Sequence, residues 1–266
     1  MTTQLYLDSL QLTQHHNSVA QLNEIIAKHL ATYSFSSINA MKADILSLDP
    51  EALIERLVLK KQGGYCFEQN KLAYLALQSL GYNVTPLLAR VKLNNNPSNA
   101  RTHRLTMVEL AGERYLFDVG FGSKCPAGLI PISQSGMVTL NTHQYKVTVT
   151  EQNVEVALVE PELLVLYSAD FIEILESDCN VAHFYSHQHP DSGFVQHLVL
   201  SRRLLGKCYT LRNLLFKEQV FSPQLSHERI LQSGEELRTV IRDIFNITIT
   251  SDDAERLFER AKRNMR

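Results

Sequence analysis

The sequence predicts an α+β fold in which helices, then antiparallel strands, then a mixture of both follow one another. Three observations support this fold class. Apolar residues recur at helical spacing in the first third, β-branched and aromatic runs succeed one another in the middle, and both patterns occur at the end. We expect three regions, residues 1–82, 83–192 and 193–266, packed as one compact body. A chain of 266 residues is long enough to bury a core without disulfides or metals.

The composition is that of an ordinary globular protein and excludes several functional classes. Hydrophobic residues make up 44% of the chain and charged residues 20%, and the formal net charge is −2. This balance gives no general attraction to nucleic acid or to anionic membranes. The N-terminus lacks a secretory signal pattern, and apolar runs fall well short of the roughly 20 residues that span a membrane. We therefore expect a cytoplasmic protein with no nucleic-acid or membrane partner and reduced thiols. The oligomeric state stays open.

Caps and apolar spacing predict three helices in the first third. Ser18 begins the first with a capping-box pattern. Asp49 followed by Pro50 begins the second, because proline suits the first helical position. The third begins near Cys66 and is terminated by Gly81.

The middle and last thirds contain the predicted strands and two further helices. In the middle third we predict strands at Val84–Leu93, Thr102–Leu110, Arg114–Val119, Met137–Thr150, Val154–Val159 and Leu163–Tyr167. In the last third we predict strands at Phe194–Leu200 and Cys208–Phe216, a helix at Glu235–Phe245 and a final basic helix opening at Ser251. Strands that follow one another without intervening helices favour an antiparallel sheet or barrel.

Cys66 lies in the most informative stretch, Gly63-Gly64-Tyr65-Cys66-Phe67-Glu68-Gln69-Asn70. The two glycines permit a tight turn, and the helical pattern begins directly after it. A helix N-terminus stabilises a thiolate through its free N–H groups and its dipole. Because the thiolate is the reactive form of cysteine, a catalytic nucleophile is one interpretation. A small buried core residue is the other.

A base and its orienting carboxylate are available on one predicted hairpin. If Ala111-Gly112 is a two-residue loop, Leu105 lies opposite Asp118, and His103 shares the face of Asp118. Diagonal neighbours on one face are about 7–8 Å apart, within reach of longer side chains. The alternative is a structural histidine beside an aspartate that only marks a strand end.

Taken together, the Cys66 stretch, Thr102-His103 and Phe117-Asp118-Val119-Gly120-Phe121-Gly122 resemble the arylamine N-acetyltransferase family. Weaker similarity extends along most of the chain. The resemblance implies a helical bundle, a central β-barrel and a C-terminal α/β lid around a Cys-His-Asp core like that of cysteine proteases. It also implies acetyl transfer from acetyl-CoA to an arylamine or arylhydrazine.

The resemblance assigns roles to individual residues. Cys66 is expected to be the nucleophile that is acetylated first, His103 the base and Asp118 its orienting partner. Phe35 and Phe121 are expected to line the pocket for the aromatic substrate, although ordinary core packing is an equal alternative.

The resemblance also suggests residues near the cofactor, and other functions stay open. Gly120, Gly122 and Ser123 are expected to let the backbone approach the pantetheine arm of acetyl-CoA, the only cofactor implied. A different Cys-His-Asp acyltransferase, amide synthase or hydrolase stays open, as does an inactive relative that only binds CoA or an aryl ligand.

The chain also departs from the family pattern. Gln62 replaces an arginine before the two glycines, and Ser36 and Ser37 stand where the family has Glu-Asn. We hypothesise that the two lost charges form a buried ion pair in relatives, because losing both partners costs less than losing one.

Three histidines and a second cysteine are alternative candidates for a chemical site. The spacing of His183, His187 and His189 has no settled metal-binding geometry and no obvious fourth ligand, so we expect a polar loop near the cleft and no metal. Cys125 follows Asp118 closely, and we expect an inert thiol there.

Overall fold

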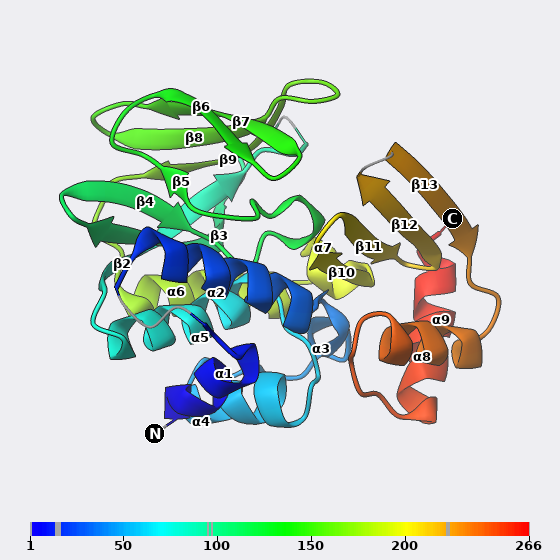
Figure 1. Ribbon diagram of the computed structural model, residues 1–266. Helices are drawn as coiled ribbons and strands as arrows, with labels where there is room; N and C mark the ends of the chain where they lie inside the picture. The colour runs from blue at the N-terminus through cyan, green and yellow to red at the C-terminus, as the bar shows by residue number, and fades with distance from the viewer. Residues whose placement is uncertain (1, 14–16, 95, 97, 222–223, 266) are drawn as a thin grey trace.

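The computed structural model describes residues 2–13, 17–94, 96, 98–221 and 224–265. Helices dominate the first region, and two antiparallel sheets follow (Figure 1). The fold is therefore α+β, as predicted. The boundaries at residues 82/83 and 192/193 remain a prediction, since the short strand β1 (Phe35–Ser36) of the first region joins the sheet of the third.

The first region is a bundle of short helices around the N-terminal part of the core. Its helical segments are α1 (Thr2–Leu10), α2 (Val19–Thr32), α3 (Ile38–Met41), α4 (Pro50–Leu53), the π-helical η1 (Ile54–Leu59) and α5 (Cys66–Ser79). As predicted, the Ser18 hydroxyl oxygen accepts a hydrogen bond from the Gln21 amide at 3.1 Å. Gly81 follows α5 with φ +84°, the left-handed conformation that ends helices.

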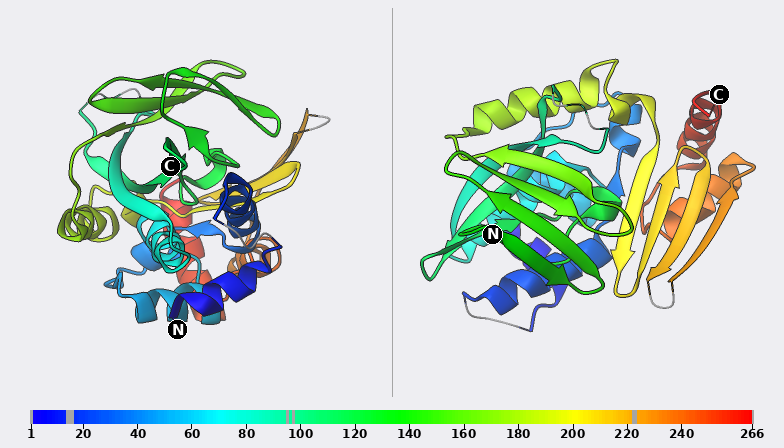
Figure 2. Two further views of the ribbon diagram at one scale, coloured as in Figure 1. Left: turned by 60° about the vertical axis from the view of Figure 1, so that its left-hand side comes forward. Right: turned by 90° about the horizontal axis from the view of Figure 1, so that it is seen from above.

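An eight-stranded antiparallel sheet curls into a nearly closed barrel (Figure 2). Its strand order is β5-β4-β3-β2-β9-β8-β7-β6. The strands are β2 (Asn83–Val91), β3 (Arg101–Leu110), β4 (Glu113–Phe117), β5 (Ile130–Pro131), β6 (Gly136–Leu140), β7 (His143–Val149), β8 (Asn153–Leu158) and β9 (Leu164–Asp170). Every second side chain along the strands points into the barrel, and these inward-facing side chains are mainly aliphatic residues and tyrosines.

A smaller five-stranded sheet packs against two C-terminal helices and forms a separate apolar core with them. Its order is β1-β10-β11-β12-β13, with β10 (Val199–Leu204), β11 (Lys207–Arg212), β12 (Leu215–Phe221) and β13 (Gln224–Ile230). The remaining helices are α6 (Glu176–Gln188), α7 (Gly193–Gln196), α8 (Gly234–Asp243) and α9 (Ser251–Arg263).

Three predicted strands are wrong in their extent. Residues 208–216 span most of β11 and the start of β12, because the chain turns at Asn213, where φ is +52°. Residues 137–150 form two strands, β6 and β7, because the chain turns at Asn141, where φ is +53°. Residues 194–200 begin as helix α7 and become strand only at Val199. The Ser192 hydroxyl caps α7 by accepting a hydrogen bond from the Phe194 amide.

Candidate functional site

His103 and Asp118 are brought together by the β3–β4 hairpin. The loop has two residues, Ala111 and Gly112, with φ +53° and +83°, and Leu110 pairs with Glu113 as predicted. His103 Nε2 lies 2.7 Å from Asp118 Oδ2. The predicted register therefore places the imidazole and the carboxylate in direct hydrogen-bond contact.

Asp118 is held by donors on both carboxylate oxygens. Besides His103 on Oδ2, its Oδ1 accepts hydrogen bonds from Asn70 Nδ2 at 2.9 Å and from the Gly120 amide at 2.8 Å. Asn70 is fixed in turn by the Arg104 carbonyl oxygen and by the Val119 amide. Asn70 thus orients the carboxylate from helix α5, a role that the sequence analysis did not assign to it.

The buried imidazole and carboxylate stabilise each other's charged forms. Burial on its own would lower the pKa of His103, but the Asp118 charge, its hydrogen bond and a hydrogen bond with Cys66 together raise that pKa to about 10. Burial would raise the pKa of Asp118, whereas His103, Asn70 and the Gly120 amide lower it. The arrangement therefore favours an imidazolium beside a carboxylate.

Cys66 is the first residue of α5 and completes the cluster. Cys66 lies close enough to His103 to raise the pKa of that ring, whose Nε2 already contacts Asp118. The Cys66 thiol also lies 3.6 Å from the Thr102 carbonyl oxygen on β3. Sulfur, imidazole and carboxylate thus converge from three separate segments. We predicted an accessible cleft, but Cys66 is only 3% exposed, so little of it meets the surface.

The start of α5 is anchored by a buried ion pair. Glu68 Oε2 accepts a hydrogen bond from the Tyr65 amide at 3.1 Å, and Glu68 Oε1 lies 2.6 Å from Arg56 Nε. Arg56 also donates to the Ser47 carbonyl oxygen. The carboxylate therefore caps the helix that carries Cys66 and joins it to the preceding segment.

Gly120 has no room for a side chain. A Cβ there would lie 2.7 Å from Asn70 Nδ2 and 2.8 Å from Cys66 Cα. Close packing of the Cys66 backbone against the Asp118 loop accounts for this glycine. Gly122 has φ +71° and faces Phe35 and Ser201, and Ser123 follows it in the short helical turn η2 (Gly122–Lys124).

Aromatic rings surround the cluster. The Phe121 ring contacts His103 edge-on at a centroid distance of 4.9 Å and Tyr167 at 5.1 Å. Phe35 is buried and contacts Phe194 at 5.6 Å. The structure thus places Phe121 directly on the imidazole, while Phe35 lies in the core beside Gly122. The sequence analysis did not place Phe194 among these aromatic residues, because it interpreted residues 194–200 as a strand.

His183 and His187 lie on helix α6, so the predicted polar loop is wrong; only His189 lies at its end. Asp178 Oδ2 caps the helix by accepting the Leu175 amide hydrogen bond. His183 Nδ1 contacts the Tyr65 hydroxyl at 2.6 Å, and burial lowers the pKa of His183 to about 3. His183 Nε2 contacts the Leu46 carbonyl oxygen, and His187 Nε2 accepts a hydrogen bond from the Leu46 amide. Among the described residues, no His, Cys, Asp or Glu group is arranged to hold a metal.

The environment of Cys125 favours the predicted inert thiol. Cys125 is fully buried and donates a hydrogen bond to the Asp118 carbonyl oxygen at 3.3 Å. Burial raises the pKa of its thiol well above the usual value.

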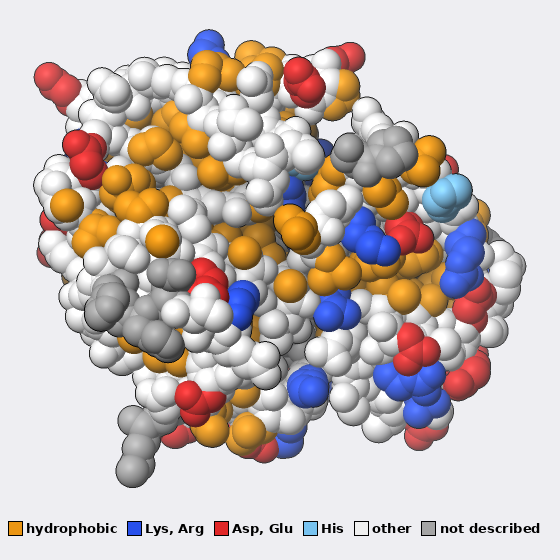
Figure 3. Space-filling model, in the orientation of Figure 1, with side chains coloured by type: hydrophobic (Ala, Val, Ile, Leu, Met, Phe, Trp, Pro, Cys, Tyr) orange, Lys and Arg blue, Asp and Glu red, His pale blue; other side chains and the backbone are white. Residues whose placement is uncertain are grey.

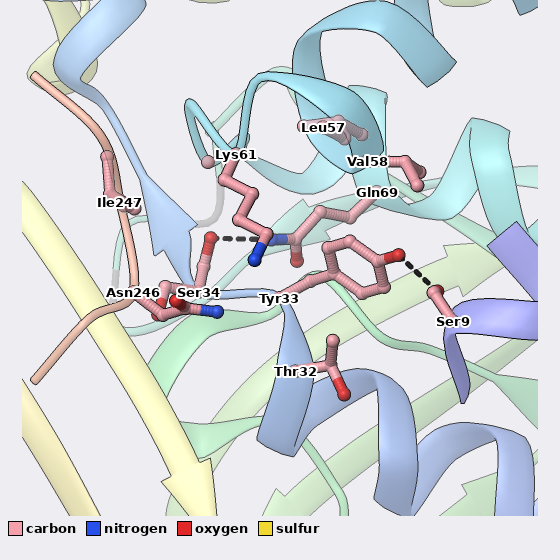
Figure 4. A pocket seen from close by; sticks show the side chains of 11 residues that line it. Ser9, Thr32, Tyr33, Ser34, Leu57, Val58, Lys61, Gln69, Asn246 and Ile247 are labelled. Carbon is pink, nitrogen blue, oxygen red and sulfur yellow. Dashed lines mark hydrogen bonds between the residues drawn. The ribbon is translucent and has the colours of Figure 1, made fainter. Parts of the chain in front are cut away.

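A pocket of about 170 Å³ lies between the helical region and the segment at Asn246 and Ile247 (Figure 4). Gln69 extends into it from α5 and donates to the Ser34 carbonyl oxygen at 2.9 Å. The residues lining this pocket do not include Cys66.

Comparison with known proteins identifies the family. A family model described as N-acetyltransferase matches residues 18–254. The arylamine N-acetyltransferase of Escherichia coli is 31% identical over 244 residues, covering 91% of this chain and 86% of that protein. The chain belongs to the arylamine N-acetyltransferase family. This is an acyltransferase family, and the chain is an enzyme of that class.

Solved arylamine N-acetyltransferases share the whole fold. The enzyme from Salmonella typhimurium superposes with a TM-score of 0.91 at 24% identity, covering 97% of this chain and 98% of the other. The Mycobacterium marinum enzyme in complex with CoA gives 0.90 at 22% identity, covering 97% and 99%. In the described part of this N-acetyltransferase, no helix is long and apolar enough to cross a membrane.

The two segments at which the resemblance implies opposite charges in relatives lie side by side in this member of the family. The Ser36 amide donates to the Gly64 carbonyl oxygen at 2.8 Å, and a Cβ on Gly63 would lie 2.7 Å from Ser36 Cβ. Gln62 therefore directly precedes Gly63, the residue that packs against Ser36. The ion pair hypothesised in relatives stays a prediction that this proximity favours.

Proposed function

We propose that this protein transfers an acetyl group from acetyl-CoA to the nitrogen of an arylamine or arylhydrazine, through an acetyl-cysteine at Cys66. The family provides the reaction class. The single observation that carries the mechanism is the 2.7 Å contact of His103 with Asp118, made beside Cys66, which helps to raise the pKa of the imidazole.

In the first half-reaction, the Cys66 thiolate attacks the thioester carbonyl carbon. The resulting oxyanion is stabilised by N–H groups in the first turn of α5. Its collapse breaks the bond from carbon to the CoA sulfur, and that sulfur takes a proton from the His103 imidazolium. Asp118 keeps the ring oriented throughout.

In the second half-reaction, the amine nitrogen attacks the acetyl-Cys66 carbonyl carbon. Neutral His103 accepts the proton that the nitrogen loses, and the Cys66 thiolate leaves. The products are the amide and the original imidazolium–thiolate pair. Because the first product leaves before the amine reacts, the kinetics are ping-pong. Phe121, which lies against His103, forms one wall for the aryl ring, and Phe35 a second. Gly120, Gly122 and Ser123 line the approach of the pantetheine arm.

Intact-protein mass spectrometry after mixing with acetyl-CoA tests the proposal. We expect one added acetyl group, mapped by peptide analysis to Cys66, and loss of that group when an arylamine is added. Cys66→Ser should abolish the adduct, whereas the matched control Cys179→Ser should keep it. Acetyl transfer that persists in Cys66→Ala would overturn the mechanism.

The other acyltransferase classes are separated by the same assay. An amide synthase would prefer a carrier-bound acyl group as its donor, whereas a hydrolase would use water as its acceptor. A panel of acyl donors, tested with and without amine, therefore discriminates among them. Stabilisation by CoA without an acylated species would instead indicate an inactive binding relative.

A further inference from the structure

Arg104 is a fully buried cation on β3 and directly follows His103 in the chain. Figure 3 shows Lys and Arg side chains of this protein at the surface, where water solvates their charge, whereas Arg104 is 0% exposed. A buried guanidinium is stable only where its charge is paired and its N–H groups are bonded. The burial of Arg104 therefore implies a specific partner.

That partner is Glu176, the first residue of α6. Arg104 Nη1 lies 2.9 Å from Glu176 Oε2, and Nη2 lies 2.7 Å from Oε1, so the two groups form a bidentate pair. The guanidinium carbon also lies 5.3 Å from the centre of the Tyr74 ring on α5. Arg104 Nε has no hydrogen-bond partner among the described residues, so the two terminal nitrogens make the contact. Arg104 thus fixes β3 against two helices at one point.

Other charged and titratable groups of α5 and α6 surround this pair. Lys71 Nζ on α5 lies 2.9 Å from Glu176 Oε2, and Cys179 and His183 on α6 lie within range of the Arg104 charge. Burial raises the pKa of Glu176, but the hydrogen bonds and charges of Arg104 and Lys71 outweigh it and lower that pKa to about 2. The carboxylate therefore stays ionised at neutral pH and keeps hold of Arg104.

The backbone of Arg104 contacts the candidate site directly. Successive side chains of a strand point to opposite faces, so His103 reaches Asp118 on one face while Arg104 reaches the helices on the other. The Arg104 carbonyl oxygen accepts a hydrogen bond from Asn70 Nδ2 at 2.6 Å, and the same nitrogen donates to Asp118 Oδ1 at 2.9 Å. A shift of Arg104 would therefore move both the imidazole and the amide that orients the carboxylate.

We propose that Arg104 is a positioning residue for acyl transfer, because its bond to Glu176 holds β3 in the place from which the His103 imidazole reaches its carboxylate. The inference rests on the proposed function and adds to it a residue outside the Cys-His-Asp cluster. The imidazolium persists in a buried site only while His103 and Asp118 stay in their 2.7 Å contact. Loss of the anchor loosens that contact, and a misplacement of about 1 Å can slow a reaction roughly a hundredfold.

Two opposite effects on His103 distinguish positioning from a simple charge effect. If Arg104 acted only through its positive charge, Arg104→Met would raise the pKa of His103, because a neighbouring cation disfavours the imidazolium. If Arg104 positions β3, the same variant lowers that pKa, because it weakens the contact with Asp118 that raises it. Arg104→Lys keeps the charge but loses the bidentate geometry, so only positioning predicts an effect in that variant.

The pKa of His103 is measured by NMR titration of the ring Cε1–H signal, which is assigned with His103→Gln. We expect the midpoint to fall by about one pH unit in Arg104→Met and by about half as much in Arg104→Lys. In parallel, acetylation of Cys66 by p-nitrophenyl acetate should slow roughly tenfold to a hundredfold in Arg104→Met.

Lys71→Met is the matched control. Lys71 contacts the same Glu176 carboxylate and lies 5.5 Å from the centre of the same Tyr74 ring, but it does so from α5 and leaves Arg104 bound. This variant removes one positive charge from the network and should change neither the midpoint nor the acetylation rate.

A midpoint that stays or rises in Arg104→Met would overturn the assignment, as would an equal fall in Lys71→Met. If Arg104→Met does not fold, Arg104→Lys decides, and an unchanged midpoint there would rule out positioning. The NMR titration needs no activity, so the two hypotheses fail separately. A wild type that p-nitrophenyl acetate does not acetylate would contradict the proposed function, whereas an insensitive midpoint contradicts only the anchor.

Discussion

His103 Nε2 and Asp118 Oδ2 lie 2.7 Å apart, with both side chains 2% exposed. They come from the two strands of one hairpin, and the carboxylate is held further by helix α5. The geometry of this pair is therefore fixed by the sheet register and by the helix together.

Asp118→Asn should reduce the rate of Cys66 acetylation by roughly 10³–10⁴-fold, because the amide cannot stabilise the imidazolium. The burst of product in rapid-quench assays with acetyl-CoA gives this rate. Circular dichroism should show an unchanged fold. A variant that acetylates at the wild-type rate would remove Asp118 from the mechanism.

The same pair should make stability depend on pH in a defined window. The pKa of His103 is raised from 6.5 to about 10, so its stabilising contribution is complete below pH 6.5 and is lost as the pH rises toward 10. The pKa of Asp118 is lowered from 3.8, so its contribution is complete above pH 3.8 and is lost on further acidification.

The contribution of the pair is measured against the double variant His103→Gln/Asp118→Asn by urea unfolding. We expect the free energy of unfolding of the wild type to exceed that of the variant most between roughly pH 4 and pH 6.5, and by less at pH 9. A difference that grew from pH 6 to pH 9 would contradict the raised pKa of His103.

Asn70→Asp should destabilise the protein by about 3 kcal/mol, since it places a second buried negative charge against Asp118 Oδ1 and removes a donor. The matched control is Gln78→Glu, the same amide-to-acid change on the exposed side of α5, which should alter the free energy of unfolding by less than about 0.5 kcal/mol. Equal effects of the two substitutions in urea would show that Asn70 does not hold the carboxylate.

Gly120→Ala should cost about 1–3 kcal/mol of stability and slow acetylation, because the new methyl group would press on Asn70 and on the Cys66 backbone. Thermal unfolding and the acetylation burst measure the two effects. Gly136→Ala is the control, since no atom lies within 4 Å of a Cβ at that glycine. A fully active Gly120→Ala enzyme would disprove the close packing.

Arg56→Leu should destabilise the protein by about 3–5 kcal/mol, because it strands the buried Glu68 carboxylate. Adding Glu68→Leu should recover much of the loss. The exposed pair of Lys60 and Glu55 provides the comparison, and Lys60→Ala should cost less than about 1 kcal/mol. If the double variant were no more stable than Arg56→Leu, the stranded charge would not be the cause.

Local sequence signals predict the parts of the site that depend on short-range geometry. The two-residue loop determines the register of His103 against Asp118, and the glycines before Cys66 predict a helix start. The helix cap at Ser18 is likewise a local feature. These predictions hold because the chemistry of a turn or cap is contained in a few neighbouring residues.

Features that depend on tertiary packing were not predictable in this way. Asn70 resembles any polar residue on a helix until the Asp118 loop is folded against it. Arg203 looks like an ordinary strand residue until the η2 turn and His143 are folded against it. His183 and His187 sit on a helix whose polar residues gave no clear apolar stripe, so periodicity could not identify it.

The two-residue strand β1 has a consequence for the integrity of the chain. Phe35 pairs with Ser201 of the smaller sheet and also bridges to Gly64, and Ile247 packs against Gly63. A truncation after residue 192 would remove β10, which pairs with β1. It would also remove Ile247, which covers one side of the turn at Gly63. Residues 1–192 alone therefore lack contacts that their own fold uses: β1 depends on pairing with Ser201, and the turn before Cys66 depends on packing against Ile247.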